Sequence, residues 1–231
     1  MSIRYHVLHE TVTTYHRAVT LSQQFLHMTP RSFAYQTTES HALSITPKPQ
    51  DWSNRVDYFG NATRLLTLST PHPELTVVSD SVVTLEPRPD RSQLVNSPTW
   101  EDQRARLRTT VGAATLDPYE FLFNSPHIAC GDELAKYAYP SFTPGRPLLE
   151  ACMDLTERIH SDFKYDPEAT PIATPLIEVL RGRQGVCQDF AHVMIGCLRS
   201  LGLSCRYVSG YILTMPPEGQ PRLVGADASH A

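Results

Sequence analysis

No excess of charge of either sign marks this 231-residue sequence, which has 20 lysines and arginines against 24 aspartates and glutamates. The net charge of −4 gives no indication of a nucleic-acid partner or of a membrane surface. No apolar run approaches the roughly 20 residues that cross a bilayer. The first residues, Met1 to His6, lack the apolar core of a signal peptide. The sequence therefore predicts a cytoplasmic protein with no nucleic-acid and no membrane partner.

Paired cysteines and metal-binding motifs are also missing. The five cysteines are odd in number, widely spaced and without a C-x-x-C pair, which argues for free thiols and against a disulfide framework or a zinc ribbon. The ten histidines include no H-E-x-x-H motif. His6 and His9 are three apart in an expected strand, so their side chains point to opposite faces. We expect no metal and no cofactor.

The first ninety residues alternate between strand-forming segments and turn residues. Gly60-Asn61 lies between two of these segments and suits a hairpin turn with positive φ. The pattern predicts an antiparallel β-sandwich over residues 1–90, ending in the proline-rich stretch 86–92. Because this part shows no catalytic constellation, we interpret it as a scaffold or an interaction module. The expected strands are 3–16, 19–28, 37–46, 52–59, 62–69 and 75–85.

Helical periodicity replaces the alternation in residues 91–231, which we take as a second domain. Leu148, Cys152, Leu155 and Ile159 recur at helical spacing, so Cys152 should lie on a core face. Strands expected at 206–213 and from 223 onward give an α+β pattern. The expected helices are 99–108 with Thr99 as cap, 117–122, 131–138, 148–160, 174–180 with Thr174 as cap and Pro175 in its first turn, and 187–201.

The most specific stretch of the chain is Gly185-Val186-Cys187-Gln188-Asp189-Phe190-Ala191-His192. Its glycine predicts a tight turn that lets backbone approach a substrate, and the apolar residues that follow fit a largely buried helix ending before Gly202. A cysteine at a helix N-terminus faces unpaired N–H groups and the positive end of the helix dipole, which favour the thiolate. A packing thiol is the alternative for any cysteine. The position of Cys187 favours the reactive role.

Two later segments follow this stretch in order: Leu201 to Tyr211, and Asp227-Ala228-Ser229-His230-Ala231. Together the three resemble the core of bacterial transglutaminase-like proteins, a group of papain-like cysteine enzymes. Asp57-Tyr58-Phe59-Gly60-Asn61 resembles part of the β-sandwich that precedes this core in one bacterial branch. The resemblance covers nearly the whole chain. It implies an α+β fold, with an N-terminal antiparallel β-sandwich before a papain-like core in which His230 faces Cys187.

The resemblance also implies a role for each polar residue of the site. Cys187 would attack an amide carbonyl, and His230 would take the thiol proton and give it to the leaving amine. The backbone N–H of Cys187 is a natural donor to the oxyanion. Gln184 is a second candidate donor, and it can equally be a solvated loop residue.

In the family, an aspartate on the strand after the histidine orients the imidazole. The sequence ends at Ala231, one residue after His230, without such an aspartate. Asp227 lies three residues before His230, so in a strand its side chain would point the other way. We therefore interpret the chain as truncated inside its catalytic domain and expect weak activity or none.

Other polar and aromatic residues of this region are predicted to be structural. His192 lies on a different side of the helix from Cys187 and is interpreted as a buried histidine. Asp189 should complement the helix dipole and point away from the thiol. Core packing is expected for Cys197 and Cys205, and also for Tyr165, Tyr207 and Tyr211, for which lining the cleft is the alternative.

Three functions remain open from the sequence. The first is a cysteine enzyme that acts on amide or peptide bonds of a peptide or protein substrate, with hydrolysis favoured over cross-linking by the resemblance. The second is a binding module that keeps a peptide groove without turnover. The third is an acyltransferase with the same triad logic, as in arylamine acetyltransferases. The sequence does not indicate an oligomeric state.

Overall fold

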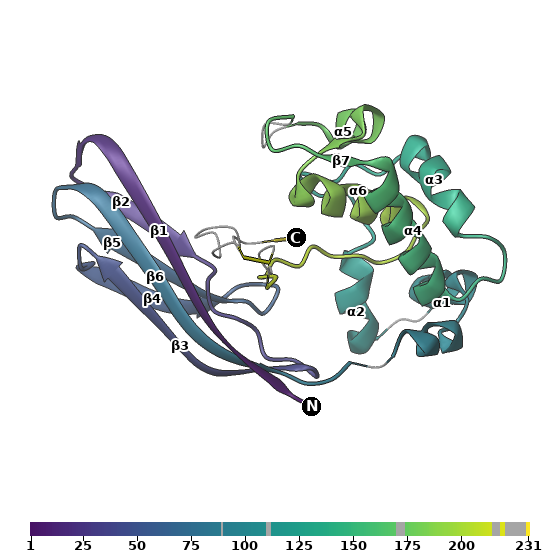
Figure 1. Cartoon of the computed structure of the whole chain (residues 1–231), viewed down its shortest axis with the longest axis horizontal. Coiled ribbons are helices and arrows are strands. Elements are labelled where there is room, and N and C mark those ends of the chain that lie inside the picture. The colour runs from purple at the N-terminus through teal and green to yellow at the C-terminus, as the bar shows by residue number, and fades with distance from the viewer. Residues whose placement is uncertain (89, 110–111, 170–173, 214–217, 220–229) are drawn as a thin grey trace. The chain divides into compact units, whose positions relative to one another are not determined.

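The structure, a computed structural model, describes residues 1–88, 90–109, 112–169, 174–213, 218–219 and 230–231. The chain divides into two compact units, Met1–Pro89 and Asp90–Ala231 (Figure 1). We call them the β unit and the helical unit and describe each by itself. In the described residues, no helix has both the length and the apolar character needed to cross a lipid bilayer.

The described part of the β unit consists of two three-stranded antiparallel sheets with the orders β1-β6-β3 and β2-β5-β4. Alternation of apolar and polar residues produces these strands, because successive side chains point to opposite faces. Apolar side chains from both sheets form its core, which confirms the antiparallel sandwich. The strands are β1 (Ile3–Val19), β2 (Ser22–Leu26), β3 (Gln36–Thr46), β4 (Asp51–Val56), β5 (Ala62–Leu68) and β6 (His72–Leu85). The core residues are Leu66, Leu68, Leu75 and Val77, packed against Tyr15, Leu26, Met28, Leu43 and Ile45.

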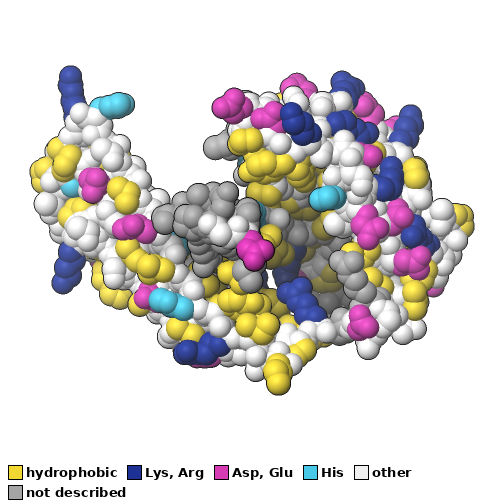
Figure 2. All heavy atoms as spheres, viewed as in Figure 1, with side chains coloured by type: hydrophobic (Ala, Val, Ile, Leu, Met, Phe, Trp, Pro, Cys, Tyr) yellow, Lys and Arg dark blue, Asp and Glu magenta, His cyan; other side chains and the backbone are white. Residues whose placement is uncertain are grey.

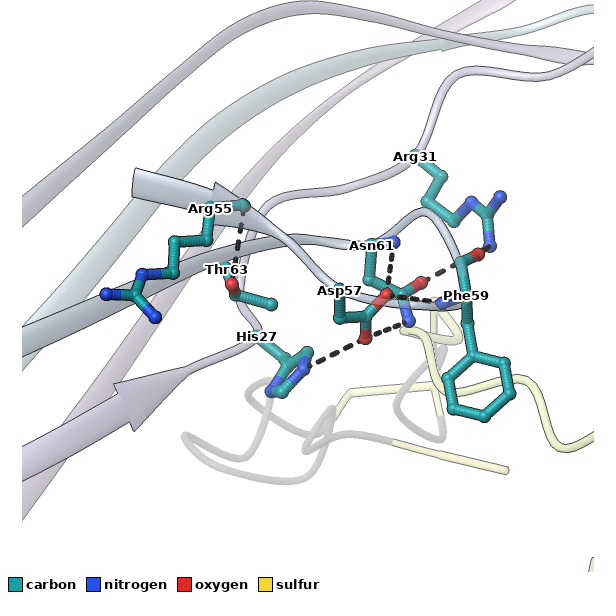
Figure 3. A network of polar contacts seen from close by, with 7 residues as sticks. All are labelled: His27, Arg31, Arg55, Asp57, Phe59, Asn61 and Thr63. Carbon is teal, nitrogen blue, oxygen red and sulfur yellow. Dashed lines mark hydrogen bonds and ion pairs between the residues drawn. The ribbon is translucent and has the colours of Figure 1, made fainter. Parts of the chain in front are cut away.

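The turn between β4 and β5 is organised by Asp57 (Figure 3). Its Oδ1 accepts hydrogen bonds from the backbone N–H groups of Phe59 (2.9 Å) and Asn61 (2.7 Å). Its Oδ2 accepts one from the Asn61 side chain (2.8 Å) and lies 3.3 Å from His27 Nε2. Gly60 has φ +79°, as a turn of this kind requires. The predicted turn is confirmed, but β4 ends at Val56 because Asp57 turns the backbone away from the ladder.

Helices dominate the second unit (Figure 1). Thr99 Oγ1 accepts a hydrogen bond from the Asp102 N–H at 3.2 Å, which confirms the predicted cap. On the face shown in Figure 2, the acidic and basic side chains of this unit are interspersed. Its elements are η1 (Arg91–Asn96), α1 (Trp100–Thr109), α2 (Ala113–Glu120), α3 (Asp132–Ala138), η2 (Tyr139–Ser141), α4 (Leu148–Asp162), β7 (Lys164–Tyr165), α5 (Leu176–Gly182), β8 (Gln184–Gly185) and α6 (Cys187–Ser200).

Helix α6 is the centre of the helical unit and contacts α3, α4 and α5. Val193 and Cys197 are fully buried on it, as the apolar pattern predicts. Gly196 permits close packing, because a Cβ there would lie 2.8 Å from Leu176 Cδ2 of α5 and 3.0 Å from Leu134 Cδ1 of α3. The predicted core position of Cys152 is also confirmed, since it packs against the same cluster. The packing of its buried side therefore holds α6 in place within the unit.

Three local predictions for this unit are wrong. Tyr165, expected in the core, is 64% exposed. Helix α5 begins at Leu176 with Pro175 as its N-cap, because Pro175 has an extended ψ of 137° and separates Thr174 from the helix. Residues 206–213 form no continuous strand in the described structure; they contribute one bridge, between Gly210 and His230. A strand requires a ladder partner. The stretch expected to provide it, from residue 223 onward, lies outside the described residues except for His230 and Ala231.

Candidate active site

The turn that leads into α6 is fixed on both sides. β7 and β8 pair in parallel, and the N–H of Lys164 donates to the carbonyl of Arg183 at 2.9 Å. The N–H of Asp166 donates to the carbonyl of Gly185 at 2.8 Å. Arg183 has a positive φ of 54°, and its guanidinium lies over the rings of Tyr137 (4.2 Å) and Phe163 (4.9 Å). These contacts determine where the next residues begin their helix.

Gly185 and Asp189 together fix the turn at which α6 begins. The N–H of Val186, the N-cap residue, donates to Asp189 Oδ2 at 2.9 Å. Gly185 has φ +156°, and a Cβ at this position would lie 2.5 Å from the same oxygen. Only glycine allows the carboxylate to reach the Val186 N–H. This contact supports the predicted dipole-complementing role of Asp189.

Cys187 is the first residue of α6 and is partly buried. The helical ladder starts after it, with the Phe190 N–H donating to the Val186 carbonyl at 3.2 Å. The first N–H groups of a helix have no intrahelical acceptor, so that of Cys187 is available to an oxyanion. Burial raises the pKa of Cys152 to about 11 and that of Cys197 to about 12. Burial also raises the pKa of Cys130 and of Cys205, so all four other thiols are held in the protonated form.

His230 pairs with Gly210 through two backbone hydrogen bonds, of 2.8 Å from its own N–H and 3.0 Å to its carbonyl. Its Nε2 is buried and has no hydrogen-bond partner among the described residues. No hydrogen bond joins this imidazole to Cys187 Sγ in that part of the chain, so the predicted Cys–His pair stays a prediction. Gln184 lies exposed in β8, next to the turn. Asp227 falls outside the described residues.

Three aromatic side chains, those of His127, His192 and Tyr207, stand in a row. The imidazoles of His127 and His192 are stacked, with centroids 5.6 Å apart and planes 6° apart. The Tyr207 ring lies 5.4 Å from that of His192. Burial raises the pKa of Tyr207, and the negative charge of a Cys187 thiolate raises it further. Tyr207 is therefore the member of the row on which the charge of Cys187 acts.

A pocket of about 340 Å³ opens along this row. We call it the α6 pocket, because one face of that helix supplies Gln188, His192, Ile195 and Arg199. Burial lowers the pKa of His192, the charge of His127 lowers it further, and that of Asp189 raises it. The remaining lining residues are Ser125, Pro126, His127, Ile128 and Tyr207.

The sequence-based interpretation underestimated this side of α6. His192 is partly buried as expected, yet it faces a pocket and not a closed core. No sequence-based prediction covers Arg199 or His127. Gln188, His192 and Arg199 recur at four- and seven-residue spacing on an otherwise apolar helix, which indicates a shared face. That spacing is the signal that could have identified them. His127 has no such signal, because only the tertiary fold brings it to α6.

No group of three or more histidine, cysteine, aspartate or glutamate side chains in the described residues is arranged to hold a metal ion. The site built by the described residues is therefore a cysteine at a helix N-terminus, a fixed glycine turn before it and a polar pocket beside it.

Comparisons with family models identify the class of protein to which this fold belongs. Residues 5–84 match the bacterial transglutaminase-like N-terminal region, and residues 136–231 match the transglutaminase-like superfamily. The chain belongs to this superfamily, whose enzymes use a cysteine. Its relatives include an uncharacterized protein of Mycobacterium tuberculosis, 40% identical over 99% of this chain and 72% of the relative. An uncharacterized protein of Mycobacterium leprae is 31% identical over 90% of this chain and 71% of the relative.

A solved structure has the same fold. It is a crystal structure from Cytophaga hutchinsonii, described as that of a putative cysteine protease, with a TM-score of 0.71 and 20% identity. The match covers all of this chain and 73% of the other. The α+β fold expected from the sequence is confirmed by this likeness and by the family match.

Proposed function

We propose that this protein hydrolyses amide or peptide bonds through an acyl-enzyme on Cys187. The observation that carries the proposal is the position of Cys187, at the first residue of α6 behind a turn that both Gly185 and Asp189 fix. The Cytophaga protein's description as a cysteine protease points the same way. A peptide or protein is the proposed substrate.

Residues of this chain can carry out each proton transfer and bond change up to the thioester. His230 accepts the thiol proton, and the Cys187 sulfur forms a bond to the amide carbonyl carbon. The backbone N–H of Cys187 donates to the resulting oxyanion, and the exposed Gln184 is a second candidate donor. The C–N bond then breaks as His230 returns the proton to the amine, leaving a thioester. Water resolves this thioester in a hydrolase, and a primary amine resolves it in a transamidase.

Selective alkylation tests the nucleophile. At pH 7, iodoacetamide should modify Cys187 at least ten-fold faster than the other four thiols, because only thiolates react and burial keeps those four protonated. Mass spectrometry of proteolytic peptides measures the modified fraction of each cysteine. The matched controls are Cys187→Ser, which should remove the fast phase, and Cys205→Ser, which should keep it. Equal labelling of all five thiols would favour the binding module over the enzyme.

A second experiment separates the enzymatic outcomes. A peptide anilide is offered as acyl donor with and without a primary amine, and the products are identified by mass. Free acid in both cases indicates a hydrolase, and an amine adduct that displaces the acid indicates an acyltransferase or a cross-linker. His230→Gln should lower the rate about 100-fold or more. His160→Gln, in the exposed last turn of α4, should leave it unchanged.

A further inference from the structure

Arg199 is a buried cation without a counter-ion in the described structure. Its side chain lines the α6 pocket, and the residue is only 9% exposed. Nε donates to the Cys205 carbonyl at 2.9 Å, and Nη1 donates to the Phe123 carbonyl at 2.8 Å and to Ser125 Oγ at 3.2 Å. In the described part of the chain, Nη2 has no hydrogen-bond acceptor and no carboxylate lies within ion-pairing distance of Arg199. Neutral carbonyl groups hold this guanidinium but do not neutralise it, which is costly for a buried charge.

The rest of the α6 pocket is equally short of negative charge. None of the described residues that line it is an aspartate or a glutamate. It offers hydrogen-bond donors instead: the guanidinium, the imidazoles of His127 and His192, the Gln188 amide and the Tyr207 hydroxyl. The charged groups that act on His192 are His127 and Asp189. Of these, Asp189 is engaged at the helix cap by the Val186 N–H.

We propose that the α6 pocket binds a carboxylate of the acyl donor at Arg199, several residues along the peptide from the bond that Cys187 attacks. The pocket volume of about 340 Å³ lies at the small end of ligand pockets, roughly 300–1,000 Å³, and suits one side chain or one chain end. Gln188, the residue after Cys187, lines the end of the pocket near the nucleophile, and Arg199 lies about 16 Å further along α6, because a helix rises roughly 1.5 Å per residue. A carboxylate there supplies the negative charge that Arg199 lacks and pairs with it in the strong, charge-assisted geometry of a guanidinium.

The carboxylate can belong to an acidic side chain or to the free carboxyl end of a short peptide. Identifying the ligand as part of an acyl donor rests on the proposed function. Binding of a carboxylate as such does not, so a binding experiment can test it without turnover.

The experiment uses the full chain with Cys187→Ala, which removes acyl transfer. Three N-acetylated pentapeptides are compared by calorimetry: Ac-Ala-Ala-Glu-Ala-Ala-amide, the same peptide with Gln in place of Glu, and the Gln peptide with a free carboxyl end. One of the two peptides that carry a carboxylate should bind at least ten-fold more tightly than the neutral peptide. The acidic peptide that binds identifies the source. Its binding should also raise the pKa of His192 in an NMR titration, because a nearby negative charge favours the imidazolium.

Matched variants locate the effect. Arg199→Gln should abolish the preference for acid, whereas Arg106→Gln, which removes an exposed arginine of α1, should preserve it. Because Arg199 also holds two backbone carbonyls, its variant can fail to fold. Tyr207→Phe and His192→Gln then replace it, and each should reduce the preference at least three-fold.

Three results would overturn the inference: equal affinity for the three peptides, no binding of any peptide by the folded protein, or the same loss of preference in Arg106→Gln as in the pocket variants. Failure of the proposed function gives a different result. If Cys187 shows no selective alkylation but the acid-bearing peptide still binds, the chain is a carboxylate-binding module and the inference about the pocket stands.

Discussion

At the scale of single residues, Gly185 determines the geometry of the candidate nucleophile. Gly185→Ala should lower the free energy of unfolding of the helical unit by about 2–4 kcal/mol, because it combines a positive φ with loss of the Asp189 cap. It should also slow alkylation of Cys187, since the displaced Asp189 carboxylate disturbs the first turn. Denaturant unfolding and labelling rates measure the two effects.

The adjacent turn supplies a matched control for this prediction. Gly182 ends α5, its φ is not positive, and a Cβ there would meet no atom within 4 Å. Gly182→Ala should therefore change stability by less than about 1 kcal/mol. If both substitutions cost the same, a general effect of alanine near the site, and not the approach of Asp189 to Gly185, would account for the loss.

Asp57 should make the stability of the β unit depend on pH. The hydrogen bond from the Asn61 side chain is the largest cause of its lowered pKa, with further contributions from backbone N–H groups and His27. The stabilisation is complete above the pKa of an unfolded aspartate, about 3.9, and is lost as the pH falls through the lower folded value. Asp57→Asn should therefore cost most stability near pH 6 and progressively less below pH 4.

The control for Asp57 is Asp51→Asn, at the exposed first residue of β4. Thermal unfolding of wild-type and variant chains between pH 3 and pH 6 gives the difference in stability for each substitution. The difference for Asp51 should stay constant over this range. A constant difference for Asp57 as well would show that its carboxylate does not hold the turn through its charge.

At the scale of elements, α6 combines a buried apolar side with the polar face of the α6 pocket. Burial, and then the charge of His127, lower the pKa of His192. A histidine with a lowered pKa stabilises the fold fully above its unfolded value, about 6.5, and this contribution is lost as the pH falls through the folded value. Unfolding at pH 7.5 and pH 5 should thus show that His192→Gln costs less stability at the lower pH. His160→Gln on α4 is the control, and a pH dependence of equal size there would contradict the prediction.

Local patterns explain which elements could be predicted. The strands of the β unit alternate in sequence, and α4 and α6 repeat apolar residues at helical spacing, so neighbouring side chains alone define their faces. β7 and β8 have two residues each and no periodicity, and their pairing depends on how α4 and α5 pack. The prediction for residues 206–213 was wrong because β-forming composition does not provide a ladder partner.

The same distinction applies to the candidate site. The start of α6 at Cys187 follows from a glycine and a run of apolar residues, and it could be predicted. The row of His127, His192 and Tyr207 could not, because three distant segments form it only after the chain has folded. The absence of a counter-ion for Arg199 among the described residues is likewise a tertiary property, since carbonyl groups of two separate loops surround its guanidinium.

At the scale of the whole molecule, each unit has its own apolar core, and substitutions in one core should act on that unit. Leu66 of the β unit is 1% exposed and Leu155 of the helical unit is fully buried. Replacement of either leucine by alanine leaves a cavity and should cost about 2–5 kcal/mol. Amide hydrogen exchange followed by mass spectrometry resolves the effect along the chain.

Leu66→Ala should accelerate exchange in β5 and β6 and leave α4 and α6 protected, and Leu155→Ala should do the reverse. Because exchange from core segments occurs through unfolding of the unit that contains them, the pattern reports the extent of each cooperative unit. Faster exchange in both units from either substitution would mean that the two cores unfold as one. In that case the β unit would stabilise the candidate active site directly, and the pH dependence from Asp57 should then appear in the alkylation rate of Cys187.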